Sequence, residues 1–220
     1  LTTITGTALD DRQMAASDQV RIAIQRNTDN LFWNQVTGRF DSGSVLWSTA
    51  TYSAPDWTFA VDALVSQLAS AATYFVRARA VDVAGNRTGQ TSPADSAPYG
   101  SIQTTFRWDV IRPTVSITLP AGGDFPPSAR LGAAPVFYGN YYDSLSGVAL
   151  IEYLLWNKTD NLYWTGGGWG GIPGDWPNAS IWVSSWTITS PSLSSYAGKD
   201  FLLVVRAKDA VNNVQNDFTV

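Results

Sequence analysis

The stretch Thr28-Asp29-Asn30-Leu31-Phe32-Trp33 returns 131 positions later as Thr159-Asp160-Asn161-Leu162-Tyr163-Trp164. Two further matches occur in the same order along the chain, one at a separation of 129 residues and one at 127. They are Trp47 and Trp57 against Trp176 and Trp186, and Arg79-Ala80-Val81-Asp82 with Asn86 against Arg206-Ala207-Lys208-Asp209 with Asn213. A fourth, weaker match is Gly6 with Asp10 against Gly139 with Asp143. The chain therefore contains two copies of one unit.

Each copy is about 100 residues long, and both halves carry a net charge of −2. The first copy ends near Phe106–Ile111, and Pro113 precedes a new alternating stretch, Thr114–Thr118. Proline lacks the N–H that would continue a strand ladder, so one strand ends there and another begins. We predict domains at residues 1–109 and 110–220, with a short, semi-rigid join because no Gly/Ser-rich linker separates them.

Within each copy, apolar and polar residues alternate with a period of two. Val20, Ile22 and Ile24 alternate with polar or small residues, and residues 75–80 alternate similarly. Turn-forming residues separate these stretches at intervals of about ten residues. This pattern predicts an all-β chain made of two tandem β-sandwiches, with a short helical turn at most within residues 62–72.

Composition excludes several classes of function. The 220 residues include no Cys and no His, which excludes disulfides, Cys/His zinc sites and Ser-His or Cys-His catalysis. The net charge is −4, so no basic face for nucleic acid is expected. No apolar run reaches the ~18 residues of a membrane span. Most Asp residues lie in turn contexts rather than as a facing pair, so we predict no enzyme.

The residues also resemble a known family. Ile4-Thr5-Gly6-Thr7-Ala8 with Asp10, and Tyr74–Ala80 leading into Asp82-Val83-Ala84-Gly85-Asn86, are similar to bacterial immunoglobulin-like repeats. The second copy departs from that pattern at Asn212, which replaces the glycine at position 85, and in Gly/Pro/Trp-rich insertions at residues 120–135 and 165–174.

This resemblance implies immunoglobulin-like sandwiches strung in tandem in a large secreted or cell-surface protein. We expect a non-catalytic spacer or stalk segment of a bacterial surface protein or adhesin. Its partners would be neighbouring immunoglobulin-like modules of the same polypeptide and surface glycans or proteins.

Two kinds of site stay open. Calcium prefers carboxylate and carbonyl oxygens and stiffens joints between tandem modules, whereas the same Asp residues also suit turns that close hairpins. Calcium is the one cofactor that the sequence suggests. Its candidate ligands are Asp10, Asp82, Asp109 and Asp209. The alternative function is a carbohydrate- or protein-binding module that uses aromatic residues of the second copy. Those candidates are Trp156, Tyr163, Trp169 and Trp182, and packing of the inserted loop onto its own sheet is the competing explanation.

Overall fold

The structure of the protein is a computed structural model. It describes residues 3–9, 20–88, 102–121, 137–173, 176–191, 193, 195–196 and 198–215. The chain divides into two compact units, Leu1–Trp108 (unit 1) and Asp109–Val220 (unit 2). That the predicted domains 1–109 and 110–220 each fold on their own stays a prediction.

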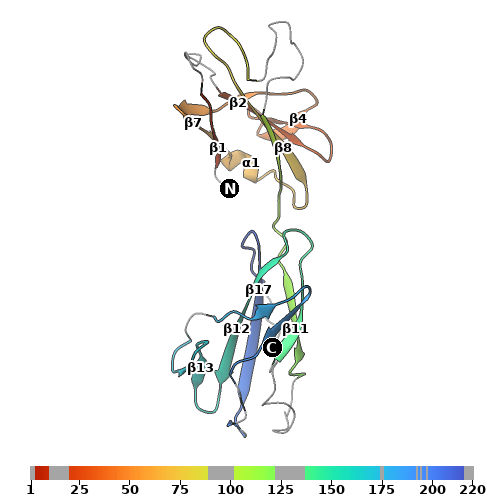
Figure 1. Cartoon of the computed structure of the whole chain (residues 1–220). Coiled ribbons are helices and arrows are strands. Elements are labelled where there is room, and N and C mark those ends of the chain that lie inside the picture. Colours follow the sequence, from red (N-terminus) through yellow and green to blue (C-terminus); the bar gives the residue numbers. More distant parts are fainter. Residues whose placement is uncertain are drawn as a thin grey trace. The chain divides into compact units, whose positions relative to one another are not determined.

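Unit 1 contains two antiparallel sheets, which lie on opposite sides of the unit in Figure 1. The smaller sheet has the order β1-β7-β6, and the larger has the order β4-β3-β2-β8-β9, with β5 also paired to β2. The strands are β1 (Thr3–Thr7), β2 (Val20–Arg26), β3 (Phe32–Asn34), β4 (Arg39–Ser42), β5 (Ser48–Thr49), β6 (Thr51–Ser53), β7 (Asp56–Ala60), β8 (Thr73–Ala80) and β9 (Ile102–Arg107). The single helix of the described residues, α1 (Asp62–Val65), lies where the sequence predicted a short helical turn.

The inner faces of these two sheets share one cluster of buried side chains. Ile22 on β2, Trp57 on β7 and Tyr74 on β8 all belong to it, at 1%, 7% and 0% exposure. Leu64 anchors α1 in the same cluster. Each large apolar side chain buried here contributes about 1.5–3 kcal/mol, which explains why the alternating residues of β2 and β8 face inward.

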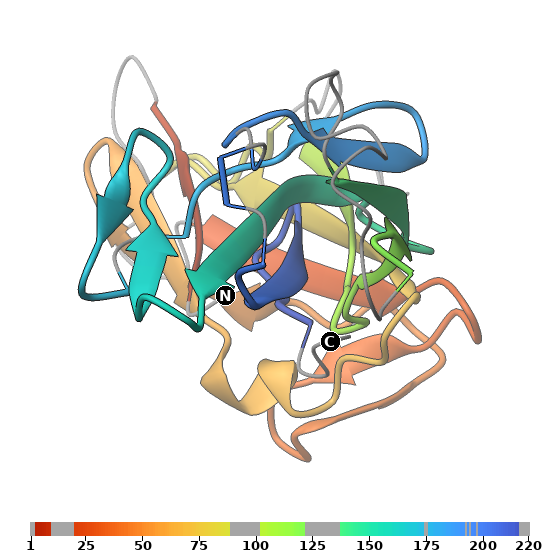
Figure 2. The same ribbon diagram turned by 90° about the horizontal axis from the view of Figure 1, so that it is seen from below.

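Unit 2 repeats this plan. One sheet has the order β10-β11-β16-β15 and the other the order β14-β13-β12-β17, with all pairs antiparallel. In Figure 2 the β13–β14 hairpin continues from the end of the long strand β12. The strands are β10 (Thr114–Leu119), β11 (Phe137–Tyr142), β12 (Val148–Asn157), β13 (Leu162–Trp164), β14 (Trp169–Gly170), β15 (Ser180–Ile181), β16 (Ser185–Ile188) and β17 (Phe201–Asp209).

A second buried cluster joins the sheets of unit 2. It includes Tyr153 and Leu155 on β12, Trp186 on β16, and Val205 on β17. Trp33, Trp57 and Trp186, which belong to the repeated matches, are all buried. The all-β prediction is confirmed, and both units place antiparallel sheets on either side of one core. That their topology is immunoglobulin-like stays a prediction.

The repeated tryptophans Trp47 and Trp176 are only partly buried and lie outside the core clusters of their units. Trp47 covers the guanidinium of Arg79 at 4.0 Å, and Trp176 covers that of Arg206 at 4.2 Å. These arginines are on outward-facing positions of β8 and β17, because their neighbours Ala78 and Val205 face inward. The same cation–π contact therefore occurs outside the core in both copies.

The structure describes the two Gly/Pro-rich insertions of unit 2 to different extents. Residues 165–168 form the tight turn of the β13–β14 hairpin, in which the backbone N–H and the side-chain hydroxyl of Thr165 both donate to the carbonyl of Gly168, each at 2.9 Å. Of the insertion predicted at residues 120–135, the part beyond residue 121 lies outside the described residues.

Candidate functional site

Three carboxylates converge at the start of unit 2. Asp109, Asp143 and Asp209 each offer one carboxylate oxygen, and these three oxygens lie within 4.8 Å of one another. Asp109 precedes β10, Asp143 follows β11, and Asp209 ends β17. The strand register therefore brings together residues that are 34 to 100 positions apart in the sequence.

Turn geometry positions Asp143 and Asp209. Oδ1 of Asp143 accepts hydrogen bonds from the backbone N–H groups of Leu145 (2.9 Å) and Gly147 (2.8 Å). Oδ1 of Asp209 accepts from Val211 (2.9 Å) and Asn213 (2.7 Å) in the same way. Such Asx turns orient a short carboxylate relative to its own loop.

Asp109 is held by two different segments. Its Oδ1 accepts from the N–H of Ile111 at 2.8 Å, and its Oδ2 accepts from the N–H of Ser146 at 3.1 Å. The side-chain amide of Asn213 donates to Oδ2 of Asp209 at 2.7 Å and to the carbonyl of Asp109 at 3.3 Å. Asn213 thus links two members of the cluster.

Burial makes this arrangement electrostatically demanding. Asp209 is 1% exposed, and Oδ2 of Asp143 is buried with no hydrogen-bond partner among the described residues. Like charges that share a partly buried site repel one another, and a buried acceptor without a donor costs free energy. A divalent cation would compensate both effects, and carboxylate oxygens are the ligands that Ca²⁺ prefers.

The sequence predicted two of these three residues. Asp109 and Asp209 were candidate ligands, whereas Asp143 was recognised only as a turn residue and as the repeat counterpart of Asp10. That match to a candidate ligand was the signal that could have added Asp143. Candidate Asp10 lies outside the described residues.

The remaining calcium candidate, Asp82, occupies the position in unit 1 that Asp209 occupies in unit 2. It accepts hydrogen bonds from the backbone N–H (2.8 Å) and the side-chain amide (2.7 Å) of Asn86. These bonds, led by the one from the side chain, lower the pKa of Asp82 below its ordinary value. Among the described residues, Asp82 joins no carboxylate cluster, so its observed contacts are those of a hairpin turn.

The structure brings two of the four aromatic candidates together. Trp156 on β12 and Tyr163 on β13 are direct cross-strand neighbours, and their rings stack at 5.6 Å and 6°. The indole N–H of Trp156 donates to Oδ1 of Asn161 at 3.2 Å. Both rings lie on the outer face of the sheet, because Leu155 and Asn157 on either side of Trp156 are buried.

The other two aromatic candidates lie elsewhere. Trp169 packs against the core of unit 2, with ring centroids 5.6 Å from Trp164 and 5.5 Å from Tyr196. Trp182 is 66% exposed and lies between β15 and β16, in the opposite sheet. Trp156, Trp169 and Trp182 therefore share no common face, and the packing alternative describes Trp169.

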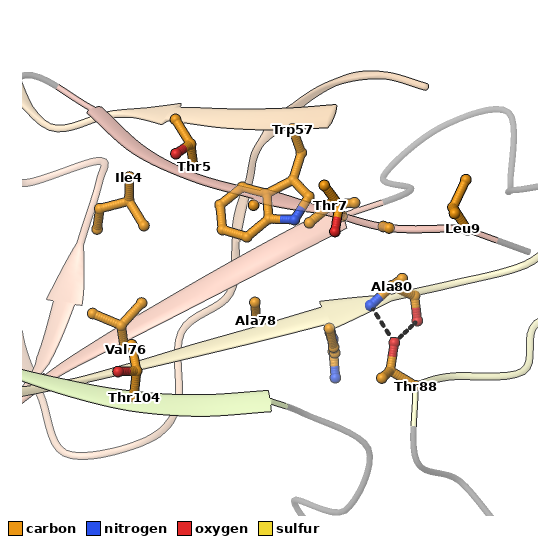
Figure 3. Close-up of a pocket in the computed structure, with 14 residues that line it drawn as sticks. Ile4, Thr5, Thr7, Leu9, Trp57, Val76, Ala78, Ala80, Thr88 and Thr104 are labelled. Carbon is orange, nitrogen blue, oxygen red and sulfur yellow. Dashed lines mark hydrogen bonds between the residues drawn. The ribbon is translucent and has the colours of Figure 1, made fainter. Parts of the chain in front are cut away.

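Unit 1 contains a cavity of about 450 Å³ between its two sheets, shown in Figure 3. The wall consists of β1, Trp57 on β7, and inward-facing residues of β8 such as Val76 and Ala78. Of the described residues that line it, Arg79 alone is ionisable. Those described residues bring no pair of acid–base groups together at the cavity.

Comparisons with known proteins leave the family unassigned. No family model matches the chain, and no curated protein matches it. A solved structure described as "Crystal structure of tetra-tandem repeat in extending region of large adhesion protein" is similar at 17% identity and a TM-score of 0.34. That similarity covers 99% of this chain and 44% of the other, so the chain spans less than half of its length. A TM-score this low establishes no shared fold.

Proposed function

We propose that the chain forms two structural modules of a large extracellular surface protein, with calcium bound by Asp109, Asp143 and Asp209. The observation that carries the proposal is the partly buried carboxylate cluster, in which Oδ2 of Asp143 has no hydrogen-bond partner among the described residues. The immunoglobulin-like resemblance and the tandem repetition support a spacer role. A spacer acts through geometry, since each module adds length.

Calcium suits this cluster for two chemical reasons. It takes six to eight oxygen ligands in a flexible geometry, so three carboxylates leave room for carbonyls or water. Extracellular calcium modules bind in the range of about 10⁻⁴–10⁻³ M, which matches a site with few dedicated ligands. The ion would tie Asp109, at the start of unit 2, to Asp143 and Asp209 and so fix the first residues of the unit.

The test is calorimetric titration of the chelator-treated chain with calcium, accompanied by thermal unfolding. We expect one calcium ion per chain and an unfolding temperature for unit 2 that rises with calcium concentration. The free energy of unfolding should increase by about 2.7 kcal/mol at 100 times Kd. Asp143→Asn should abolish both effects, because it removes a carboxylate charge whose Oδ2 has no internal donor. Asp56→Asn, an exposed position on β7, is the matched control and should leave them unchanged.

No heat and no thermal shift at about 10 mM calcium, well above the expected Kd, would contradict the calcium site. Equal responses from Asp143→Asn and Asp56→Asn would also contradict it, since binding would then be unspecific. Magnesium provides a further comparison, because its strict octahedral geometry and reluctant dehydration predict a much weaker response.

A second candidate function is carbohydrate binding at Trp156 and Tyr163. The specific observation in its favour is the nearly parallel stack of these rings on the outer face of β12 and β13, since sugars bind through flat aromatic surfaces. A glycan array should detect a ligand that Trp156→Ala loses. Trp182→Ala serves as the control because that side chain is 66% exposed and lies in the opposite sheet. Absence of any glycan signal would leave the spacer role.

A further inference from the structure

The outer face of the sheet β10-β11-β16-β15 in unit 2 carries three exposed aromatic side chains. Tyr138 and Tyr142 on β11 are 37% and 67% exposed, and Trp182, which follows β15, is 66% exposed. The two tyrosines point outward, because Phe137 and Tyr141, which alternate with them, pack into the core of unit 2. Exposed aromatic side chains that gather on one face of a module are typical of an interaction site.

The strand register places these rings around one polar residue. Ser185 on β16 pairs with Asn140 on β11, and the N–H of Trp182 donates to the carbonyl of Ser185 at 2.8 Å. Asn140 lies midway between Tyr138 and Tyr142, which are about 14 Å apart along a strand that rises about 3.4 Å per residue. Trp182 lies two strands from Asn140, about 10 Å across the sheet. The three rings therefore surround Asn140 at the corners of a triangle.

The outward positions between the aromatic side chains carry hydroxyl and amide groups and no charge. They hold Thr114 and Ser116 on β10, Asn140 on β11, Ser185 and Thr187 on β16, and Ser180 on β15. The hydroxyl of Ser116 donates to the carbonyl of Asn140 at 3.4 Å, which leaves its oxygen able to accept a further hydrogen bond. Such a face does not attract a charged partner. Its hydroxyl, amide and aromatic groups match the hydroxyl groups and apolar ring faces of a neutral carbohydrate.

Unit 1 forms the matching strand pair without an aromatic side chain at the position of Trp182. At the repeat separation of 129 residues, Ser53 corresponds to Trp182, and Asp56 corresponds to Ser185. Ser53 on β6 pairs with Asp56 on β7. The backbone bond from Trp182 to Ser185 repeats that pairing in unit 2. The strand pair therefore needs no tryptophan at this position, and unit 2 has gained an exposed ring where unit 1 has a small hydroxyl residue beside a carboxylate.

The backbone beneath Trp182 is held in place from the core side. The hydroxyl of Tyr141, whose ring packs against the core of unit 2, donates to the backbone carbonyl of Trp182. The N–H of Trp182 is bonded to Ser185 on the neighbouring strand. Both backbone groups of this exposed residue are thus bonded within the unit. A ligand that stacks on the indole would have to order the side chain alone, which lowers the entropy cost of binding.

We propose that the outer face of β10-β11-β16-β15 binds a neutral polysaccharide, with sugar rings stacked on Tyr138, Tyr142 and Trp182. Hydroxyl groups of the sugars bond to the side-chain amide of Asn140 between these rings. The separation of the rings requires a chain of several sugar units rather than a single sugar. This inference goes beyond the proposed spacer function, because it gives unit 2 a ligand. It uses no carboxylate of the calcium cluster, and it concerns the sheet opposite to that of Trp156.

The test is affinity electrophoresis of the full chain, with chelator present, in gels that contain hydroxyethyl cellulose, glucomannan, dextran or mannan. We expect at least one of these neutral polysaccharides to slow migration. Trp182→Ala should weaken that binding about tenfold, as for the loss of one aromatic anchor, and Tyr142→Ala should weaken it in the same direction. Trp156→Ala is the matched control and should leave the binding unchanged. Because Trp182 is 66% exposed, its substitution should leave the unfolding temperature of unit 2 in place.

Unchanged migration in all of these gels would overturn the proposal. Binding that Trp182→Ala leaves intact would overturn it as well, and loss of binding in Trp156→Ala instead would assign the ligand to the opposite sheet. Ionic strength gives a second measurement. Sodium chloride should not change the affinity, because no charged group of this face takes part, and binding that disappears at high salt would contradict a neutral contact.

The length of the ligand tests the arrangement of the three rings. Oligosaccharides of the polysaccharide that binds should compete for the chain in proportion to the number of rings that they reach. We expect a hexasaccharide to compete strongly and a disaccharide weakly, because the rings are about 10–14 Å apart by strand geometry. Equal competition by both would mean that a single ring binds the sugar, and it would contradict a site that extends over the face.

Discussion

Two glycines are required by the tryptophans opposite them. A Cβ at Gly139 would lie 1.9 Å from the carbonyl oxygen of Ser116 and 2.8 Å from Nε1 of Trp186. The same atom at Gly6 would lie 2.5 Å from the ring of Trp57. Contacts this short force a strand or an indole to move, so glycine is needed here for space rather than for backbone conformation.

Gly139→Ala should therefore destabilise unit 2 by at least about 2 kcal/mol, because the methyl group meets backbone that belongs to a paired strand. Urea unfolding followed by tryptophan fluorescence measures the change. Gly171→Ala is the control, since a Cβ there meets nothing within 4 Å, and it should change stability by less than about 0.5 kcal/mol. Similar midpoints for both variants would show that the Trp186–Ser116 contact can relax freely.

At the scale of elements, the paired strands β2–β8 and β12–β17 carry different charges at one matched position. Glu152 lies opposite Arg206 in unit 2 and accepts a hydrogen bond from it at 2.7 Å. In unit 1 the matched pair is Arg21 opposite Arg79. Burial, followed by repulsion from Arg87 and Arg21, lowers the pKa of Arg79 to about 10. Arg79 and Arg206 nevertheless each stack under a tryptophan. The cation–π contact is therefore common to both units, whereas the ion pair is not.

Glu152→Arg would give unit 2 the arrangement of unit 1. We expect a loss of about 1–2 kcal/mol, because a partly buried ion pair is replaced by like charges directly opposite each other. Glu152→Gln, which removes the charge alone, should lose about 0.5–1 kcal/mol. Equal losses for the two variants in low-salt urea unfolding would mean that repulsion at this position is negligible.

At the scale of the whole molecule, each compact unit has its own buried cluster. The cluster around Ile22 and Tyr74 is built from residues of unit 1, and the cluster around Tyr153 and Trp186 from residues of unit 2. No helix in the described parts of the chain has the length and hydrophobicity needed to span a membrane. Two separate cores predict two separate cooperative transitions.

We therefore expect fragments 1–108 and 109–220 to fold independently, each with a cooperative thermal transition that matches one of two transitions in the full chain. Calorimetry of the three proteins measures this. Gly139→Ala should lower the transition of unit 2 and leave that of unit 1 in place. A single transition that Gly139→Ala shifts as a whole would contradict independence.

The local structure and the internal repetition of this protein could be predicted from the order of its residues. The alternation of Val20, Ile22 and Ile24 encodes a half-buried strand within a few residues, and Asp82 and Asp209 encode their turns through hydrogen bonds to residues four positions away. These features need no distant partner, so they could be predicted from residue order alone.

Tertiary structure decided which residues meet. It added Asp143 to Asp109 and Asp209, turned Trp169 inward and Trp156 outward, and placed Trp47 over Arg79. Each outcome depends on strand register and sheet packing between segments tens of residues apart, and a shift of one residue would reverse the face of every side chain. Local sequence patterns do not determine that register. For this physical reason the sequence could suggest candidate residues, but only the fold showed which of them lie together.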